Sequence, residues 1–103
     1  MRKVSIVTGA AGGIGRAIAL QLAKEIASYG IHINCVSPGP IETPGFLKGF
    51  PAEALDRMKK SSGFDRFGKP EEIADIVSFL ASEKASFISG QNFPVCGIRN
   101  LGS

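Results

Sequence analysis

The sequence is poor in cysteine and histidine, the residues that most often serve metal or nucleophilic chemistry. It has two cysteines and one histidine in 103 residues. Cys35 and Cys96 stand in apolar, strand-like surroundings, with neither metal-ligand spacing nor the number that a disulfide framework needs. We therefore expect reduced core thiols, a cytoplasmic protein and no metal site. His32 has no carboxylate and nucleophile beside it in the sequence, so we expect it to have a surface or packing role.

Long apolar runs and long basic runs are also lacking. No apolar run approaches the roughly 20 residues of a membrane span, and glycines interrupt the apolar start of the chain, which argues against a signal peptide. The net charge is +3, and the lysines and arginines are spread along the chain. This pattern favours an ordinary solvated surface over a nucleic-acid-binding face. We expect no membrane and no nucleic-acid partner.

The length of the chain limits it to one modest core. A chain of 103 residues forms one domain at most, and a domain of this size buries about 60–65% of its unfolded surface. We expect a single domain over residues 1–97 and a loose tail over residues 98–103.

The first half of the chain predicts a strand, a helix and a second strand. Val4–Val7 is a β-branched run that is followed closely by a glycine, as expected for a strand. The segment 14–28 has a helical pattern that Gly30 stops, and Ile31–Val36 reads as a strand before the break at residues 37–40. One face of the predicted helix carries apolar residues: Ile14, Ile18, Leu22 and Ile26, with Ala17 beside them.

The second half predicts two helices and a third strand. Residues 42–50 form a loop with apolar members, and a short helix is expected from Pro51 to about Lys60. A clearer helix opens at Pro70 with two acidic residues, which favour the positive end of the helix dipole. It carries an apolar stripe that ends at Leu80. With a strand at Asn92–Val95, strands alternate with helices, which predicts an α/β fold with a parallel sheet and right-handed crossovers.

A glycine-rich turn lies between the first strand and the first helix. It reads Thr8-Gly-Ala-Ala-Gly-Gly-Ile-Gly15. Such a turn lets the backbone approach a phosphate, and the unpaired amides at the helix start attract the negative charge. Spaced glycines alone often serve only packing, but the flanking strand and helix favour a phosphate-binding loop here.

This turn resembles the TGxxxGxG motif of the short-chain dehydrogenase/reductase family. The segment 33–43, Ile-Asn-Cys-Val-Ser-Pro-Gly-Pro-Ile-Glu-Thr, is similar to the family's strand and PGxIxT segment beside the nicotinamide. Residues 66–73, 79–82 and 89–95 resemble its later helix and last strand. The overall resemblance is to members similar to bacterial 3-oxoacyl-acyl-carrier-protein reductase. It implies a truncated Rossmann-like fold of two or three layers around about three parallel strands.

The resemblance implies a set of cofactor-binding residues in two walls. In the first wall, Gly9, Gly13 and Gly15 would shape the pyrophosphate turn, and the Ile14 amide would face phosphate. In the second, the nicotinamide would be lined by Pro38, Gly39, Ile41 and Thr43. The Pro-Gly-Pro segment could instead be a simple strand-ending turn. Gly12 stands where NADP-preferring members often have a basic residue, which leans toward NAD, but the cofactor, NAD or NADP, stays open.

The family's catalytic residues have no counterpart between the two walls. Members carry a serine and a Tyr-x-x-x-Lys pair there, in which the tyrosine is the general acid/base. The one tyrosine here, Tyr29, is followed four residues later by Ile33, so no catalytic residue is assigned. The family's first helix and the later helix before its sixth strand share the sequence Leu-Ala-Lys-Glu at residues 22–25. The chain therefore looks like a family member with a large internal deletion.

The deletion implies an altered cofactor site. If the first and second strands pair directly, the two walls come to about 5 Å apart, and an extended dinucleotide would not span them as it does in the family. We expect weak or partial binding of NAD or NADP. An unpaired strand edge also favours a homo-oligomer. Three interpretations remain: an oxidoreductase fragment, a self-associating or partner-binding module, and an enzyme whose sequence here is incomplete.

Overall fold

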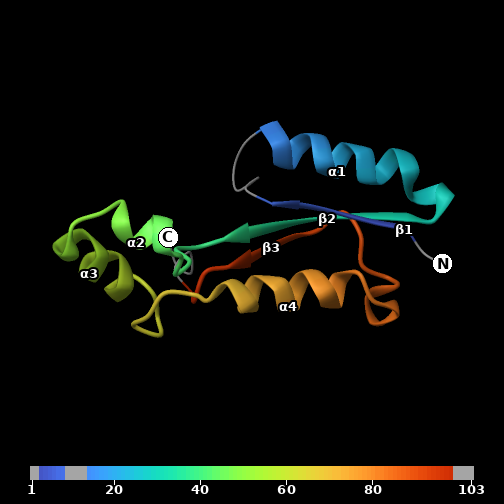
Figure 1. The fold of residues 1–103 in the computed structure, drawn as a ribbon. Coiled ribbons are helices and arrows are strands. Elements are labelled where there is room, and N and C mark those ends of the chain that lie inside the picture. The colour runs from blue at the N-terminus through green and yellow to red at the C-terminus, as the bar shows by residue number, and fades with distance from the viewer. Residues whose placement is uncertain (1–2, 9–13, 99–103) are drawn as a thin grey trace.

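The fold is a three-stranded parallel sheet covered by helices on both faces (Figure 1). The computed structural model describes residues 3–8 and 14–98. The strands are β1 (Lys3–Thr8), β2 (Ile31–Pro38) and β3 (Asn92–Val95), in the order β1-β2-β3. All three predicted strands and the predicted α/β class are confirmed. The truncated Rossmann-like sheet has the three strands expected, and its helices make three layers.

The first helix runs without a break through residues 22–25, the segment whose sequence resembles two different helices of the family. α1 spans Ile14–Ile26 and continues into a 3-10 turn at Ala27–Tyr29. Gly30 ends it with φ of 74°, a left-handed conformation that glycine adopts without steric cost. The chain then enters β2 directly. One helix therefore returns the chain from β1 to the adjacent parallel strand.

The face that α1 buries differs from the apolar stripe seen in the sequence. Ala19 and Ala23 pack against Ile33 and Cys35 of β2, with Ile26 partly buried beside them. Three of the four large members of the stripe are exposed, by 79% at Ile14, 53% at Ile18 and 42% at Leu22. Small side chains let the helix lie close to the sheet. The larger ones project from its side, where a three-stranded sheet has no further element to cover them.

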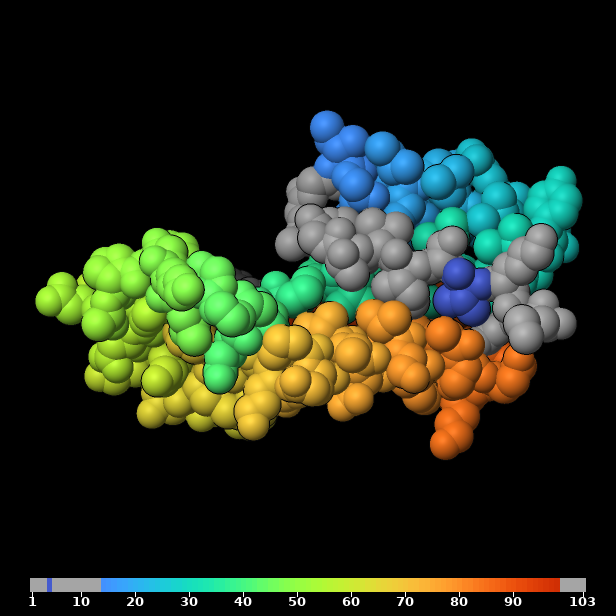
Figure 2. Space-filling view, in the orientation of Figure 1, coloured from blue at the N-terminus to red at the C-terminus, as the bar shows by residue number. Residues whose placement is uncertain are grey.

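The segment between β2 and the last helix holds two short helices that project from the sheet (Figures 1 and 2). α3 (Ala52–Lys60) matches the predicted helix, whereas α2 (Pro44–Lys48) was not predicted. Phe46 of α2 packs edge-on against the ring of Phe67, with ring centroids 5.4 Å apart, and Phe67 is buried. An aromatic contact distant in sequence therefore holds α2 in place.

α4 (Pro70–Leu80) is the helix that the sequence predicted from Pro70 to Leu80, and it covers the other face of the sheet. Leu80 packs with Val36 of β2 and with Ala85, which lies in a 3-10 turn at Glu83–Ala85. Val36 alternates with Cys35, which faces α1, so the two helices lie on opposite faces of β2. This arrangement gives the layers α1, sheet and α4.

The two crossovers wind in opposite senses. From β1 to β2 and from β2 to β3 the chain moves in the same direction across the sheet, but it passes over one face through α1 and over the other through α4. One of the two crossovers must therefore be left-handed. The prediction of right-handed crossovers throughout, which rests on their strong general preference, is wrong for this chain.

Buried polar side chains of β2 fasten the segment that leads into β3. Asn34 is fully buried; its Oδ1 accepts the Gln91 N–H at 3.1 Å, and its Nδ2 donates to the Ile88 carbonyl at 3.4 Å. Ser37 donates to the side chain of Asn92 at 2.8 Å. These bonds satisfy polar groups that would be costly to bury alone, and they fix the start of β3 on β2.

Candidate functional site

The strands that precede the two predicted walls in the sequence are adjacent in the sheet. Thr8, the last residue of β1, pairs with Val36, and β2 ends two residues later at Pro38. Neighbouring strands lie about 4.8 Å apart, so the carboxyl ends of β1 and β2 lie side by side. The direct pairing of the two strands, on which the narrow spacing of the walls depends, is confirmed.

The first wall is described only where it becomes helix. Gly9 and Gly13 lie outside the described residues. Ile14 and Gly15 form the first turn of α1. The first N–H groups of a helix have no partner within the helix, and they carry the positive end of its dipole. The first turn of α1 can therefore receive an anion.

Gly39 in the second wall has a packing reason to be glycine. Its N–H donates to the carbonyl of Val95 at 2.9 Å, which extends the pairing of β2 with β3. A Cβ at this position would lie 2.9 Å from Cα and 3.0 Å from Cβ of Cys96. The chain after β3 therefore crosses directly over Gly39, and a side chain there would collide with it.

The backbone N–H and C=O of Ile41 point away from Gly68, its partner in a short bridge. Ile41 forms an isolated parallel bridge with Gly68, in which Gly68 donates to the carbonyl of Pro40 at 3.0 Å and accepts from Glu42 N–H at 2.8 Å. In this pattern the flanking residues make the bonds, so the N–H and C=O of Ile41 point to the other side. They form a donor and acceptor pair suited to a carboxamide.

Thr43 caps the short helix α2. Its Oγ1 accepts the N–H of Phe46 at 3.2 Å, which satisfies one of the unpaired donors at the start of the helix. The hydroxyl proton stays able to donate to a ligand oxygen. Pro38, which ends β2, positions the turn that carries Gly39 and Ile41. Four of the predicted residues are thus joined in one rigid segment.

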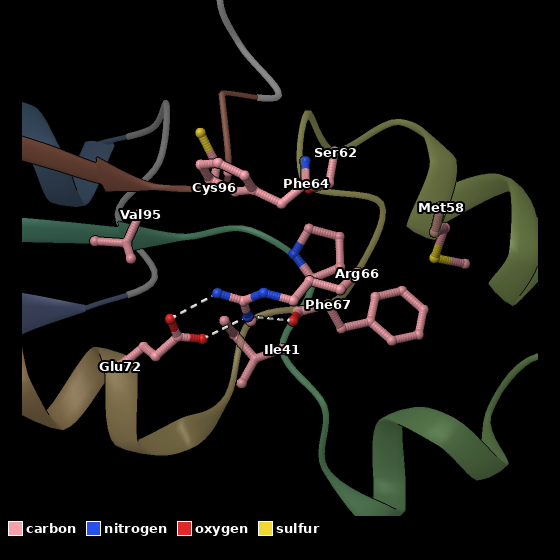
Figure 3. A pocket seen from close by; sticks show the side chains of 12 residues that line it. Ile41, Met58, Ser62, Phe64, Arg66, Phe67, Glu72, Val95 and Cys96 are labelled. Carbon is pink, nitrogen blue, oxygen red and sulfur yellow. Dashed lines mark hydrogen bonds and ion pairs between the residues drawn. The ribbon is translucent and has the colours of Figure 1, made fainter.

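A pocket of about 150 Å³ lies against the second wall and was not foreseen in the sequence (Figure 3). The turn after β2, the end of α3, the loop before α4 and the chain after β3 line it. Its walls are mostly apolar, from Ile41, Met58, Phe64, Phe67 and Val95. No local pattern could reveal it, because its residues come from four separate segments.

An Arg66–Glu72 ion pair closes one end of this pocket (Figure 3). The guanidinium donates to both carboxylate oxygens, at 2.7 and 2.9 Å, and also to the carbonyl of Phe67 at 2.9 Å. Glu72 accepts the Lys69 N–H as well, at 2.9 Å. These bonds, above all those from Arg66, lower the pKa of Glu72 to about 2. The pair locks the loop to the first turn of α4.

The remaining candidate residues lie away from the two walls. Tyr29 is exposed, next to the start of β2, at the far end of the strand from Pro38. His32 Nε2 donates to the carbonyl of Ser86 at 2.9 Å, as expected for a packing role. Cys35 is buried and Cys96 half-buried, and both are free thiols. Within residues 3–8 and 14–98, no cluster of three or more histidine, cysteine or acidic side chains could hold a metal.

Comparisons with known proteins agree on one family. A sequence model of the family described as Enoyl-(Acyl carrier protein) reductase matches residues 16–97. NADPH-dependent aldehyde reductase 2, chloroplastic, of Arabidopsis thaliana is 43% identical over 75 residues, which cover 73% of this chain and 28% of that protein. The 3-oxoacyl-[acyl-carrier-protein] reductase FabG of Thermotoga maritima is 41% identical over 75 residues, which cover 73% of this chain and 30% of that enzyme.

The chain belongs to the short-chain dehydrogenase/reductase family. Solved structures agree with the sequence matches. The angucycline C-6 ketoreductase LanV, solved with bound NADP, superposes with a TM-score of 0.81 at 28% identity, over 98% of this chain and 44% of LanV. The reductase LugOII superposes with a TM-score of 0.79 at 28% identity, over 97% of this chain and 44% of LugOII.

This short-chain dehydrogenase/reductase matches less than a third of the length of the two sequence relatives above. Its fold and its NAD(P)-dependent oxidoreductase ancestry follow from the family. No helix among the described residues is long and apolar enough to cross a membrane.

Proposed function

We propose that the chain is an oxidoreductase-family fragment that binds NAD or NADP weakly and does not transfer hydride by itself. The observation that carries this proposal is the direct pairing of β1 with β2. The two proposed walls follow neighbouring strands, and this would bring them too close together for an extended dinucleotide to span them. The sequence also has no serine and Tyr-x-x-x-Lys set between the walls.

Each wall would bind one end of the cofactor. Gly9, Gly13 and Gly15 would shape the turn around a phosphate, which the Ile14 amide would face. In the second wall, the outward N–H and C=O of Ile41 and the hydroxyl of Thr43 would bind the carboxamide, with Pro38 and Gly39 under the ring. A bound cofactor would fit one wall well and the other poorly, because the two walls would lie closer together than they do in other members of the family.

Hydride transfer needs a proton donor beside the reacting carbonyl as well as a bound nicotinamide. Tyr29 cannot serve, because it is exposed at the opposite end of β2. His32 donates Nε2 to Ser86, and it lies near the same remote end of the strand. Without an acid in place, catalysis would lack a contribution that is typically about 10²- to 10⁴-fold.

Titration with separate halves of the cofactor tests the proposal. Calorimetry with ADP, nicotinamide mononucleotide, NADH and NADPH should give dissociation constants of about 0.1 mM or weaker. The whole cofactors should bind little better than the better half. If NADH or NADPH binds at low micromolar concentration, the two walls are not too close together for an extended dinucleotide, and the proposal fails. If none of the four ligands binds, the chain has retained no part of the cofactor site, and the proposal fails as well.

A pair of glycine variants provides the matched control. Gly15→Asp places a negative charge in the first turn of α1 and should abolish ADP binding. Gly45→Asp makes the same change in α2, where an added Cβ meets nothing within 4 Å, and should leave ADP binding unchanged. In parallel, reduction of an acetoacetyl-type substrate at about 1 s⁻¹ or faster, an ordinary enzymatic rate, would overturn the lack of catalysis.

A second candidate function is self-association, with or without a catalytic role. The outer edge of β1 is unpaired among the described residues, and such edges pair readily with other strands. Reduced thiols at Cys35 and Cys96 suit a cytoplasmic module of this kind. Light scattering at micromolar concentration tests it: a mass of 10.8 kDa, that of one chain, would exclude self-association.

A further inference from the structure

The side of α1 that carries its large apolar residues has no cover within the described chain. Ile14, Ile18 and Leu22 lie one helical turn apart and are all exposed. On a helix facing a sheet, such residues normally belong to the buried stripe. Here the alanines beside them take that place. The molecule therefore presents a continuous apolar ridge that its own fold does not use.

This ridge lies on the same side of the molecule as the free edge of β1. Ala23 faces Gly90, which precedes β3, because a Cβ on Gly90 would lie 3.6 Å from the Ala23 methyl. At about 100° per residue, Leu22, Ile18 and Ile14 lie successively about 100°, 140° and 180° round the helix from Ala23. They turn away from β3, toward the β1 side of the sheet.

The chain also exposes more surface than a compact protein of its mass. Its accessible surface is 6898 Å², roughly 1,400 Å² more than the scaling law gives for a folded monomer of 10.8 kDa. Its radius of gyration is 15.4 Å, against about 13 Å for a compact domain of this length. A stable interface takes about 800 Å² from each partner. The excess is large enough to supply one.

We propose that a second copy of this chain covers both features, with β1 pairing antiparallel to β1 of the other copy across a two-fold axis perpendicular to the sheet. This inference rests on the self-association candidate above and names its surface. The axis makes a six-stranded sheet and keeps both α1 helices on one face. A strand edge needs another strand to satisfy its N–H and C=O groups, and a self-complementary edge is met by its own copy.

The register fixes which side chains meet in the dimer. Ala19 and Ala23 pack over Ile33 and Cys35, whose β1 partners are Ser5 and Val7, so the middle of α1 lies level with the middle of β1. Residue 20 is the middle of α1, and the two α1 helices run antiparallel about an axis through the middle of β1. Ile18 of each copy therefore lies opposite Leu22 of the other.

Charge complementation between residues 18 and 22 tests this arrangement. Ile18→Asp and Leu22→Lys should each weaken the dimer about a hundredfold or more, because each places a charge in an apolar contact that offers it no partner. An equal mixture of the two variants should recover the dimer mass in analytical ultracentrifugation. Phe87→Asp is the matched control, since Phe87 is 103% exposed and lies before β3, away from the ridge. It should leave the dimer unchanged.

The outcomes are distinct from those of the cofactor titration. Circular dichroism identifies any variant that fails to fold, in which case Ile18→Lys mixed with Leu22→Asp replaces the pair. A monomeric wild-type chain, a dimeric Ile18→Asp variant, or a mixture that stays monomeric would each overturn the proposal. So would a dimer that Phe87→Asp breaks and Ile18→Asp leaves intact. If a monomeric Ile18→Asp variant binds ADP, the proposed cofactor site is supported, whether or not the wild-type chain forms the dimer.

Discussion

Replacing Gly39 with alanine separates two reasons for a glycine in the second wall. A glycine beside a nicotinamide is usually explained by the close approach of the cofactor. In this chain the close approach is already made by the protein, since the new Cβ would lie 2.9 Å from Cα of Cys96. Contacts under 3.0 Å with backbone atoms cannot be relieved by a rotamer change. We therefore expect Gly39→Ala to destabilise the chain without any cofactor.

The magnitude follows from the two contacts that the new methyl group disturbs. Overpacking of this kind costs about 1–3 kcal/mol. Pushing Cys96 away also strains the bond from Gly39 N–H to the Val95 carbonyl, now 2.9 Å long, and losing it adds about 1 kcal/mol. The total, about 2–4 kcal/mol, is a large part of the roughly 5–15 kcal/mol that holds a domain together.

Urea unfolding followed by circular dichroism measures this loss. With a slope of about 1–1.5 kcal/mol/M, the midpoint should fall by about 2 M at a fixed protein concentration. Gly45→Ala is the control, because nothing lies within 4 Å of its new Cβ, and its midpoint should stay or rise slightly. Adding Cys96→Gly to Gly39→Ala should restore part of the loss, since it removes the contact at 3.0 Å and keeps the one to Cα.

An unchanged midpoint for Gly39→Ala, together with weaker cofactor binding, would refute this reasoning. It would mean that the segment after β3 yields easily and that the cofactor alone demands glycine. The reverse result, lower stability with unchanged ADP binding, is the one expected, because ADP would bind at the other wall.

Three further changes have definite expected effects. Leu80→Ala, which truncates a side chain 1% exposed, should cost about 3 kcal/mol or more in urea unfolding; a loss below about 1 kcal/mol would contradict its place in the core. Asn34→Leu should cost about 1–3 kcal/mol, because it leaves a backbone N–H and a carbonyl without their partners; a neutral effect would show that water replaces it. Because the folded-state pKa of Glu72 is lowered to about 2 from 4.5, its contribution is present above pH 4.5 and lost as pH falls toward 2. A Glu72→Gln variant should therefore lose less stability than wild type across that window, and equal losses would exclude the Arg66 pair as a cause.

The secondary structure was largely predictable because its signals are local. The β-branched run before the glycines, the stop at Gly30 and the proline and acidic residues at the start of α4 each act within a few residues. α2 escaped prediction because a proline and two glycines read as loop. Its position depends on the contact of Phe46 with Phe67, which sequence spacing does not reveal.

The candidate site was predictable as a list of residues but not as a set of contacts. The resemblance assigned Gly39 and Ile41 to one wall. It could not assign Cys96, which crosses Gly39, or Gly68, which bridges Ile41. These partners lie 57 and 27 positions away along the chain and meet only when the sheet forms.

Sequence by itself determined the family, the order of the strands and of the helices other than α2, and the candidate residues of the two walls, because motifs and hydrophobic periodicity depend on neighbouring residues. Tertiary structure alone decided which side of α1 is buried. The isoleucines and leucine formed the stronger stripe, yet Ala19 and Ala23 face the sheet. A helix joining two adjacent strands is oriented by the close packing that small side chains permit, and a sheet of three strands offers no second surface for the large ones.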